Sequence, residues 1–161
     1  RRQRQMCIRD SSRGYDNERK NFKSFNNFYL SPIICYESVY GEYVTEYTRS
    51  GSKLFAIITN DGWWDVSEGH KQHLSYAKLR AIENRRNIVR SANTGVSAII
   101  NYRGEIEDSI EYGEEGFINT NVGLIEEKTF YVNYGDYIFR ISLFFFIIIG
   151  LHFLATIVKF K

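Results

Sequence analysis

The residue with the clearest chemical potential is Cys35, which ends an apolar run at residues 28–35 (FYLSPIIC) and precedes Tyr36 and Glu37. The run suits a buried strand, and residues 39–50 read as a helix. A cysteine at such a turn exposes its sulfur, while the helix N-terminus offers backbone N–H groups and a positive dipole end. Both effects favour a thiolate and a developing oxyanion, so the pattern is typical of a nucleophile.

Other roles for these reactive side chains stay open at this point. A lone cysteine in an apolar strand is usually a buried core thiol, and Glu37 would also stabilise a helix dipole. Cys7 and Cys35 form no CxxC and no Cys/His pair of metal-ligand spacing, so neither a disulfide framework nor a zinc site is encoded. His70 and His73 lie on one predicted helix without an evident third ligand, so we expect surface or supporting roles for them rather than a metal site.

The surrounding sequence alternates between strand and helix patterns. Residues 54–59 (LFAIIT) read as a second buried strand, followed by a loop at 60–69 (NDGWWDVSEG) and a helix at 70–84. Two further strands are expected at 88–92 and 96–101. The strand–helix–strand order favours an α/β fold. The preceding residues 14–27 are polar and predict a loop.

Residues 141–158 (ISLFFFIIIGLHFLATIV) contain no Asp, Glu, Lys or Arg. As a helix they would rise about 27 Å, close to the hydrocarbon thickness of a bilayer. Tyrosines and Arg140 precede the run and Lys159 and Lys161 follow it, as expected at membrane interfaces. A buried core helix is the alternative, but an all-round apolar surface argues against packing on one side. The sequence predicts a transmembrane helix.

Composition excludes some classes of protein. With 161 residues, of which 43% are hydrophobic and 25% charged, the chain has room for about one domain with a core and is not a disordered tail. The net charge of +2 is spread over 21 basic and 19 acidic residues, so nothing indicates a nucleic-acid partner. Residues 1–13 show no periodicity and do not form a signal peptide. The string RQRQMCIRDS resembles translated sequencing-adaptor sequence, so we expect this segment to be non-native; a disordered basic arm is the alternative.

Four blocks resemble the apolipoprotein N-acyltransferase family in order and spacing. They are ICYE with Gly41-Glu42, then NDGWW, then His73 with RAIE, and then RSANTG at residues 90–95. The resemblance runs from about Pro32 to the C-terminus. Asp65 departs from it, because the family more often has glycine after the two aromatic residues. Soluble nitrilases share the cysteine turn and the Arg-Ala-x-Glu helix but lack a trailing membrane span.

The resemblance implies a fold and a reaction. The fold would be part of a nitrilase-like α-β-β-α sandwich on the periplasmic side of a bacterial inner membrane, without metal or cofactor. The reaction would move an acyl chain from a phospholipid to a cysteine thioester, and then to the α-amino group of a diacylglyceryl-cysteine apolipoprotein. Cys35 would be the nucleophile, the Tyr36 N–H would help hold the oxyanion, and Glu37 would orient the site.

The resemblance also suggests supporting residues. Trp63 and Trp64 would frame an acyl-chain pocket, although adjacent aromatic residues are as often core plugs or membrane-interface contacts. Arg80, Glu83 and Arg90 are expected to form buried ion-pair or hydrogen-bonded structure under the site.

A Glu–Lys–Cys triad is typical of nitrilase chemistry, and its glutamate and lysine would lie far upstream of the cysteine. We therefore expect the chain to be a fragment that is inactive alone. Its parts would be a non-native segment (1–13), the C-terminal part of a catalytic domain (14–136), and a transmembrane helix with a short cytoplasmic tail (137–161). Two rivals stay open: a membrane-tethered carbon–nitrogen hydrolase and a non-catalytic membrane-anchored module.

Overall fold

A single mixed sheet forms the centre of the computed structural model, which describes residues 19–65 and 67–159. The segment 1–13, with Cys7, and the terminal Lys161 lie outside the described residues. The strands are adjacent in chain order: β1 (Phe22–Lys23), β2 (Tyr29–Ile34), β3 (Ser52–Asn60), β4 (Asn87–Asn93), β5 (Ser97–Ile100) and β6 (Ile106–Ile110). Strands β2, β3 and β4 run parallel, and the outer pairings are antiparallel.

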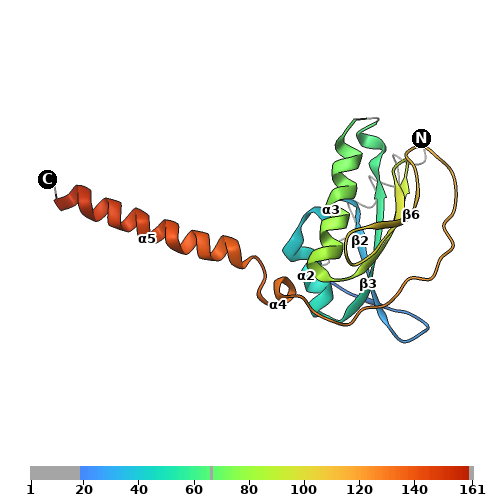
Figure 1. Ribbon diagram of the computed structural model, residues 1–161, viewed down its shortest axis with the longest axis horizontal. Coiled ribbons are helices and arrows are strands. Elements are labelled where there is room, and N and C mark those ends of the chain that lie inside the picture. Colours follow the sequence, from blue (N-terminus) through green and yellow to red (C-terminus); the bar gives the residue numbers. More distant parts are fainter. Residues whose placement is uncertain (1–18, 66, 160–161) are drawn as a thin grey trace.

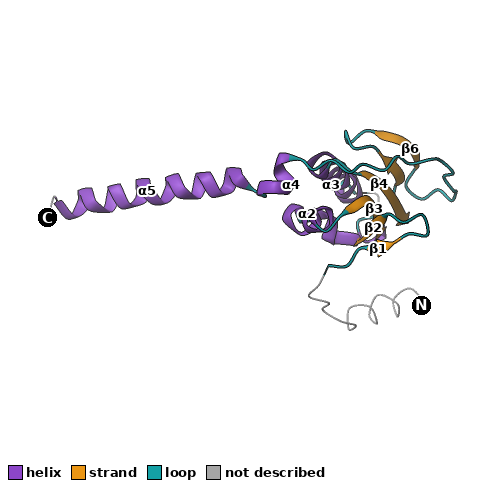
Figure 2. Ribbon diagram, turned by 90° about the horizontal axis from the view of Figure 1, so that it is seen from below, coloured by secondary structure: helices purple, strands orange, loops and turns teal. Residues whose placement is uncertain are grey.

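Helices connect the parallel strands and lie together on one face of the sheet (Figures 1 and 2). The helical elements are η1 (Cys35–Val39), α2 (Gly41–Arg49), η2 (Asp61–Trp63), α3 (Gly69–Asn84), α4 (Phe130–Tyr134) and α5 (Tyr137–Lys159). The two crossovers β2–α2–β3 and β3–α3–β4 confirm the predicted α/β class, because parallel neighbours need such connections.

The core lies between the sheet and these helices. Ile33, Phe55 and Ile57 point from β2 and β3 onto Val44 of α2 and Ala77 of α3, and all of them are buried. Alternate strand residues face the other way. There Ile34 and Ile58 are register partners and are 50% and 54% exposed. The described residues thus build one helical layer on one sheet, which is one half of the expected sandwich.

The observed secondary structure differs from the prediction in three places. The helix predicted over 39–50 is preceded by the short 3₁₀ helix η1, so the chain turns at Cys35 itself. The segment 14–27, predicted as loop, contains β1, whose two residues pair with β2. Strand β6 (IEDSI) was not predicted, because its central polar residues interrupt the apolar alternation.

Helix α5 extends away from the sheet and its helices (Figure 1). Its segment Tyr137–Ile157 is long and apolar enough to cross a membrane, and none of its most apolar window is buried. The base of α5 is tied to α2, because Glu42 Oε1 accepts hydrogen bonds from the Asp136 backbone N (3.0 Å) and from Arg140 Nη2 (3.1 Å). The predicted apolar helix is therefore present and joins the domain through polar contacts.

Neighbouring isoleucines on opposite faces of β3 test this layering. We expect Ile57→Ala to lower the free energy of unfolding by about 2–4 kcal/mol, because Ile57 is 1% exposed and its removal leaves a cavity. Ile58→Ala is the matched control and should cost less than about 1 kcal/mol, since Ile58 is half exposed. Urea unfolding of the chain in detergent micelles measures both. Equal losses would show that both faces of β3 are covered.

Candidate active site

Cys35 sits in a constrained turn at the carboxyl end of β2. Its φ of 50° lies in the left-handed region, which costs a non-glycine residue of order 1–3 kcal/mol. Contacts from η1 and α3 meet at the Cys35 carbonyl. It accepts a hydrogen bond from Ser38 Oγ (2.9 Å) and lies 3.2 Å from His73 Nε2. The half-buried thiol is therefore presented by a backbone that its neighbours fix.

Glu37 stabilises the same turn. Its Oε2 accepts a hydrogen bond from the backbone N of Ile34 (2.8 Å), and its Oε1 accepts one from the Tyr43 hydroxyl (2.8 Å). Burial, followed by hydrogen bonds with Tyr47 and Glu37, raises the pKa of Tyr43, so this phenol stays a donor. Glu37 thus contacts the residue before the cysteine, and its recorded hydrogen bonds go to that backbone N–H and to Tyr43 rather than to the sulfur. This geometry fits an orienting role.

Asp61, the first residue of η2, is the centre of a buried polar network. Its Oδ1 accepts from His73 Nδ1 (2.9 Å) and from Thr59 Oγ1 (2.9 Å), and its Oδ2 accepts from Arg90 Nη2 (2.5 Å). Arg90 also donates to the Val96 carbonyl, which ties the network to the loop between β4 and β5. All these side chains are 5% exposed or less, except that of Val96, which contributes only its carbonyl.

The charge on Asp61 is firmly held. Burial alone would raise the pKa of this carboxyl, but the hydrogen bonds from His73 and Arg90, with the charge of Arg90, lower it from 3.8 to about 2. Since the folded pKa is the lower one, this group contributes stability above about pH 3.8, and that stability is lost as the pH falls through about 2. Asp61 is therefore a permanent anion at neutral pH.

The network reaches the cysteine through Thr59. Its Oγ1 lies 3.3 Å from Cys35 Sγ, and it is the penultimate residue of β3. The carboxyl ends of parallel strands meet at one edge of a sheet, which is why β2 and β3 bring Cys35, Thr59 and Asp61 together. Neither Thr59 nor Asp61 was predicted as a site residue. The available signal was the position of Thr59 at the end of a buried strand and of Asp61 directly after that strand.

The two histidines of α3 are buried, not exposed. His73 is 2% exposed and belongs to the network beneath Cys35. Of the two roles expected for it, surface or supporting, its position fits the supporting one. His70 is 7% exposed and stacks on Tyr112 at 4.6 Å between ring centroids. A surface role is therefore wrong for both, because both lie on the buried face of α3. Arg80 and Glu83 form the expected ion pair, at 3.2 Å.

Aromatic side chains flank the cysteine turn on one side. The Trp64 ring lies 5.3 Å from that of His73 and 6.5 Å from that of Tyr36, whose ring is also 6.2 Å from Tyr40. Trp63 is 70% exposed, and none of the ring contacts recorded for the described residues involves it. The structure thus brings Trp64, and not Trp63, to the predicted site.

The backbone at Gly69 and at Asp65 explains the position of Trp64. A Cβ on Gly69 would lie 2.4 Å from the Trp64 ring, so this ring requires glycine beneath it. Asp65, which departs from the family's usual glycine, has a φ of 49°, a conformation that glycine adopts freely and aspartate tolerates. The loop keeps the geometry for which glycine is common.

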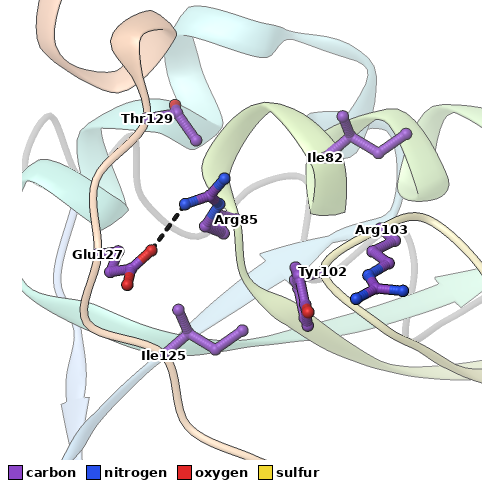
Figure 3. Close-up of a pocket in the computed structure, with 7 residues that line it drawn as sticks. All are labelled: Ile82, Arg85, Tyr102, Arg103, Ile125, Glu127 and Thr129. Carbon is purple, nitrogen blue, oxygen red and sulfur yellow. Dashed lines mark hydrogen bonds and ion pairs between the residues drawn. The ribbon is translucent and has the colours of Figure 1, made fainter.

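Two hollows in the described part of the chain are not lined by Cys35 itself. Figure 3 shows one of about 680 Å³, lined by Ile82, Arg85, Tyr102, Arg103, Ile125, Glu127 and Thr129. Within it Arg85 Nη1 pairs with Glu127 Oε2 at 2.6 Å. A second hollow, of about 570 Å³, lies at the base of α5 and is lined by residues that include Tyr40, Tyr131, Phe139 and Arg140. Through Tyr40 this second hollow borders the aromatic side of the cysteine turn.

Comparison with known proteins assigns the sequence to a protein family. Residues 18–126 match the family model of carbon-nitrogen hydrolases. The chain is similar to the apolipoprotein N-acyltransferase of Geobacter metallireducens, with 41% identity over 104 residues, covering 65% of this chain and 20% of that protein. The corresponding enzyme of Thermotoga maritima is 32% identical over 126 residues, covering 76% and 25%. The chain thus spans about a fifth to a quarter of the length of these curated relatives.

Solved structures share the fold. A carbon-nitrogen hydrolase from Helicobacter pylori G27 superposes with a TM-score of 0.56 at 13% identity, covering 62% of this chain and 42% of that one. An amidase from Nesterenkonia sp. superposes with a TM-score of 0.52 at 16% identity, covering 77% and 46%. At these identities the likeness shows the nitrilase-like fold alone.

The buried ion pair beneath the cysteine provides a stability test. We expect Asp61→Asn to lower the free energy of unfolding by about 3–5 kcal/mol, because it leaves the Arg90 guanidinium, which is 0% exposed, without its counter-ion. Urea unfolding at neutral pH measures the loss. In the control Glu68→Gln, which breaks the exposed Glu68–Lys71 pair, the midpoint should hardly move. A loss in Asp61→Asn no larger than in this control would contradict the network.

Proposed function

The chain belongs to the carbon-nitrogen hydrolase family, and from this membership we propose that it supplies the nucleophile of an apolipoprotein N-acyltransferase. The enzyme would transfer a fatty acyl chain from a phospholipid to the N-terminal amino group of a diacylglyceryl-cysteine apolipoprotein. One observation carries the proposal: a cysteine in a fixed left-handed turn stands in the same chain as a helix of bilayer length. Soluble carbon-nitrogen hydrolases have no need of such a helix.

The proposed reaction has two steps. The Cys35 thiolate attacks the ester carbonyl of the phospholipid, the C–O bond breaks, and the lysophospholipid leaves with a proton as its alcohol. The α-amino group of the apolipoprotein then attacks the thioester, the C–S bond breaks, and the amine loses a proton as the amide forms. Thiols suit this sequence because sulfur attacks esters readily and a thioester remains open to an amine.

Three residues of the turn have proposed roles in these steps. Cys35 is the nucleophile, and the backbone N–H of Tyr36 helps to hold the oxyanion of each tetrahedral intermediate. Glu37 orients the turn through the Ile34 N–H. We further propose that the general base and the oxyanion-binding lysine come from sequence outside this chain, since Glu37 is already engaged by Ile34 and Tyr43. The 161 residues alone are then expected not to turn over.

The lipid substrate would approach from the side of α5. The hollow at the base of α5 combines Phe139 and Tyr131 with the ion pair of Arg140 and Glu42. Tyr40 connects it to Tyr36 beside the cysteine. The aromatic side chains of this lining suit the apolar acyl chains of a phospholipid. Trp64 would line the acyl-chain path, and Trp63 would contact the membrane interface.

Replacement of the nucleophile tests the proposal. We expect Cys35→Ser, in the full-length protein that contains this sequence, to lower acyl transfer to a diacylated lipopeptide by several orders of magnitude, because an unactivated hydroxyl is a far weaker nucleophile than a thiolate. The assay measures lipopeptide product, and an unchanged thermal midpoint confirms folding. Wild-type rates in the variant would place the nucleophile elsewhere. If the unsubstituted protein released free fatty acid instead of forming acylated lipopeptide, it would be a membrane-tethered hydrolase.

The orientation of α5 is a separate prediction. We propose that the domain is periplasmic and that the end of the chain after α5 is cytoplasmic in a bacterial inner membrane, because lysines follow the apolar segment. Alkaline phosphatase fused after Lys161 should be inactive, and green fluorescent protein fused at the same point should fluoresce. The reverse pair of results would invert the topology.

A further inference from the structure

The hydroxyl of Thr59 lies between two acceptors of different kinds. Its Oγ1 is 3.3 Å from Cys35 Sγ and 2.9 Å from Asp61 Oδ1. We propose that Thr59 is a positioning residue whose hydroxyl turns from Asp61 to the sulfur when Cys35 becomes a thiolate. The proposal rests on the proposed role of Cys35 as the nucleophile and adds a residue to its support.

A threonine hydroxyl carries one proton and can donate to one acceptor at a time, but it also accepts. While Cys35 is a thiol, the S–H can donate to Thr59 Oγ1 and the hydroxyl can donate to Asp61. When the thiol proton has left, the sulfur becomes the acceptor, and the hydroxyl serves it by rotating about its own C–O bond. No backbone movement is needed.

Asp61 keeps other partners when it releases this hydrogen bond. Its Oδ1 keeps the bond from His73 Nδ1 (2.9 Å), and its Oδ2 keeps the bond from Arg90 (2.5 Å). A buried carboxylate with those two partners is still satisfied. The network therefore holds the hydroxyl in place in the thiol state and frees it in the thiolate state.

Thr59 is well suited to this task. It is 5% exposed, so a hydrogen bond to a charged sulfur is little weakened by competing water. Its branched Cβ restricts the side chain to few rotamers, which fixes the oxygen near the sulfur. Bonds to ionised acceptors are roughly twice as strong as neutral ones, so the thiolate gains more from Thr59 than the thiol does.

Alkylation of Cys35 by iodoacetamide tests the proposal without any lipid, because only the thiolate reacts. The 161-residue chain is used in detergent micelles with Cys7→Ser, which leaves one cysteine. In Thr59→Val we expect the rate at neutral pH to fall about tenfold and the midpoint of the rate-against-pH curve to move up by about one unit. The limiting rate at high pH should stay within about twofold, since access to the sulfur is unchanged.

Two further variants separate this role from a structural one. Thr59→Ser keeps the hydroxyl and should follow the parent curve. Thr45→Val removes another buried threonine hydroxyl, one bonded to the Gly41 carbonyl at 2.8 Å, and should not shift the curve. If Thr59→Val does not fold, Thr59→Ala removes the same hydroxyl without adding bulk and should give the same shift.

Three results would overturn the inference: a Thr59→Val curve that coincides with the parent, a Thr59→Ser curve shifted equally, or an equal loss of rate at every pH. The alkylation result is independent of acyl transfer. Suppose that Thr59→Val shifts the rate-against-pH curve as expected, but that the Cys35→Ser variant still transfers acyl groups. The proposed function would then be rejected, and the Thr59–Cys35 hydrogen bond would stand.

Discussion

The site depends on one buried interaction, the contact between the Asp61 carboxylate and the Arg90 guanidinium. Neither side chain is exposed, so each charge would be costly to bury without the other. The pair joins the end of β3 to β4, and the other carboxylate oxygen of Asp61, Oδ1, bonds to His73 on α3. His73 then reaches the Cys35 carbonyl, so a chain of contacts runs from the ion pair to the turn that carries the thiol.

This arrangement explains how the chain keeps Cys35 in a left-handed conformation. The turn itself is unfavourable for a residue with a side chain. Ser38 Oγ donates to the Cys35 carbonyl, and His73 Nε2 lies 3.2 Å from the same oxygen. Glu37 accepts from the N–H of the residue before the cysteine. Because these contacts come from η1 and α3, the conformation is imposed by the packing of helices on the sheet. Strain maintained in this way is a common feature of functional sites.

Much of this architecture could be predicted from the sequence. The apolar runs before Cys35 and Asn60 indicated two buried strands, because the strands of a parallel sheet read as nearly continuous apolar runs. The role of Asp61 was not predictable, because a carboxylate in a loop gives no sign of its burial. Thr59 resembles any strand threonine until β2 is placed beside β3. Trp63 and Trp64 are identical in type, and only the left-handed turn at Asp65 and the space above Gly69 decide which ring lies beside the cysteine.

If Cys35 carries an acyl group during turnover, the covalent intermediate can be detected directly. The full-length protein would be incubated with phospholipid in the absence of any amine acceptor, digested, and analysed by tandem mass spectrometry. We expect a fatty acyl mass on the peptide that contains Cys35, and we expect neutral hydroxylamine to remove it, as it removes thioesters. An unmodified Cys35 peptide in protein that goes on to acylate a lipopeptide would contradict it.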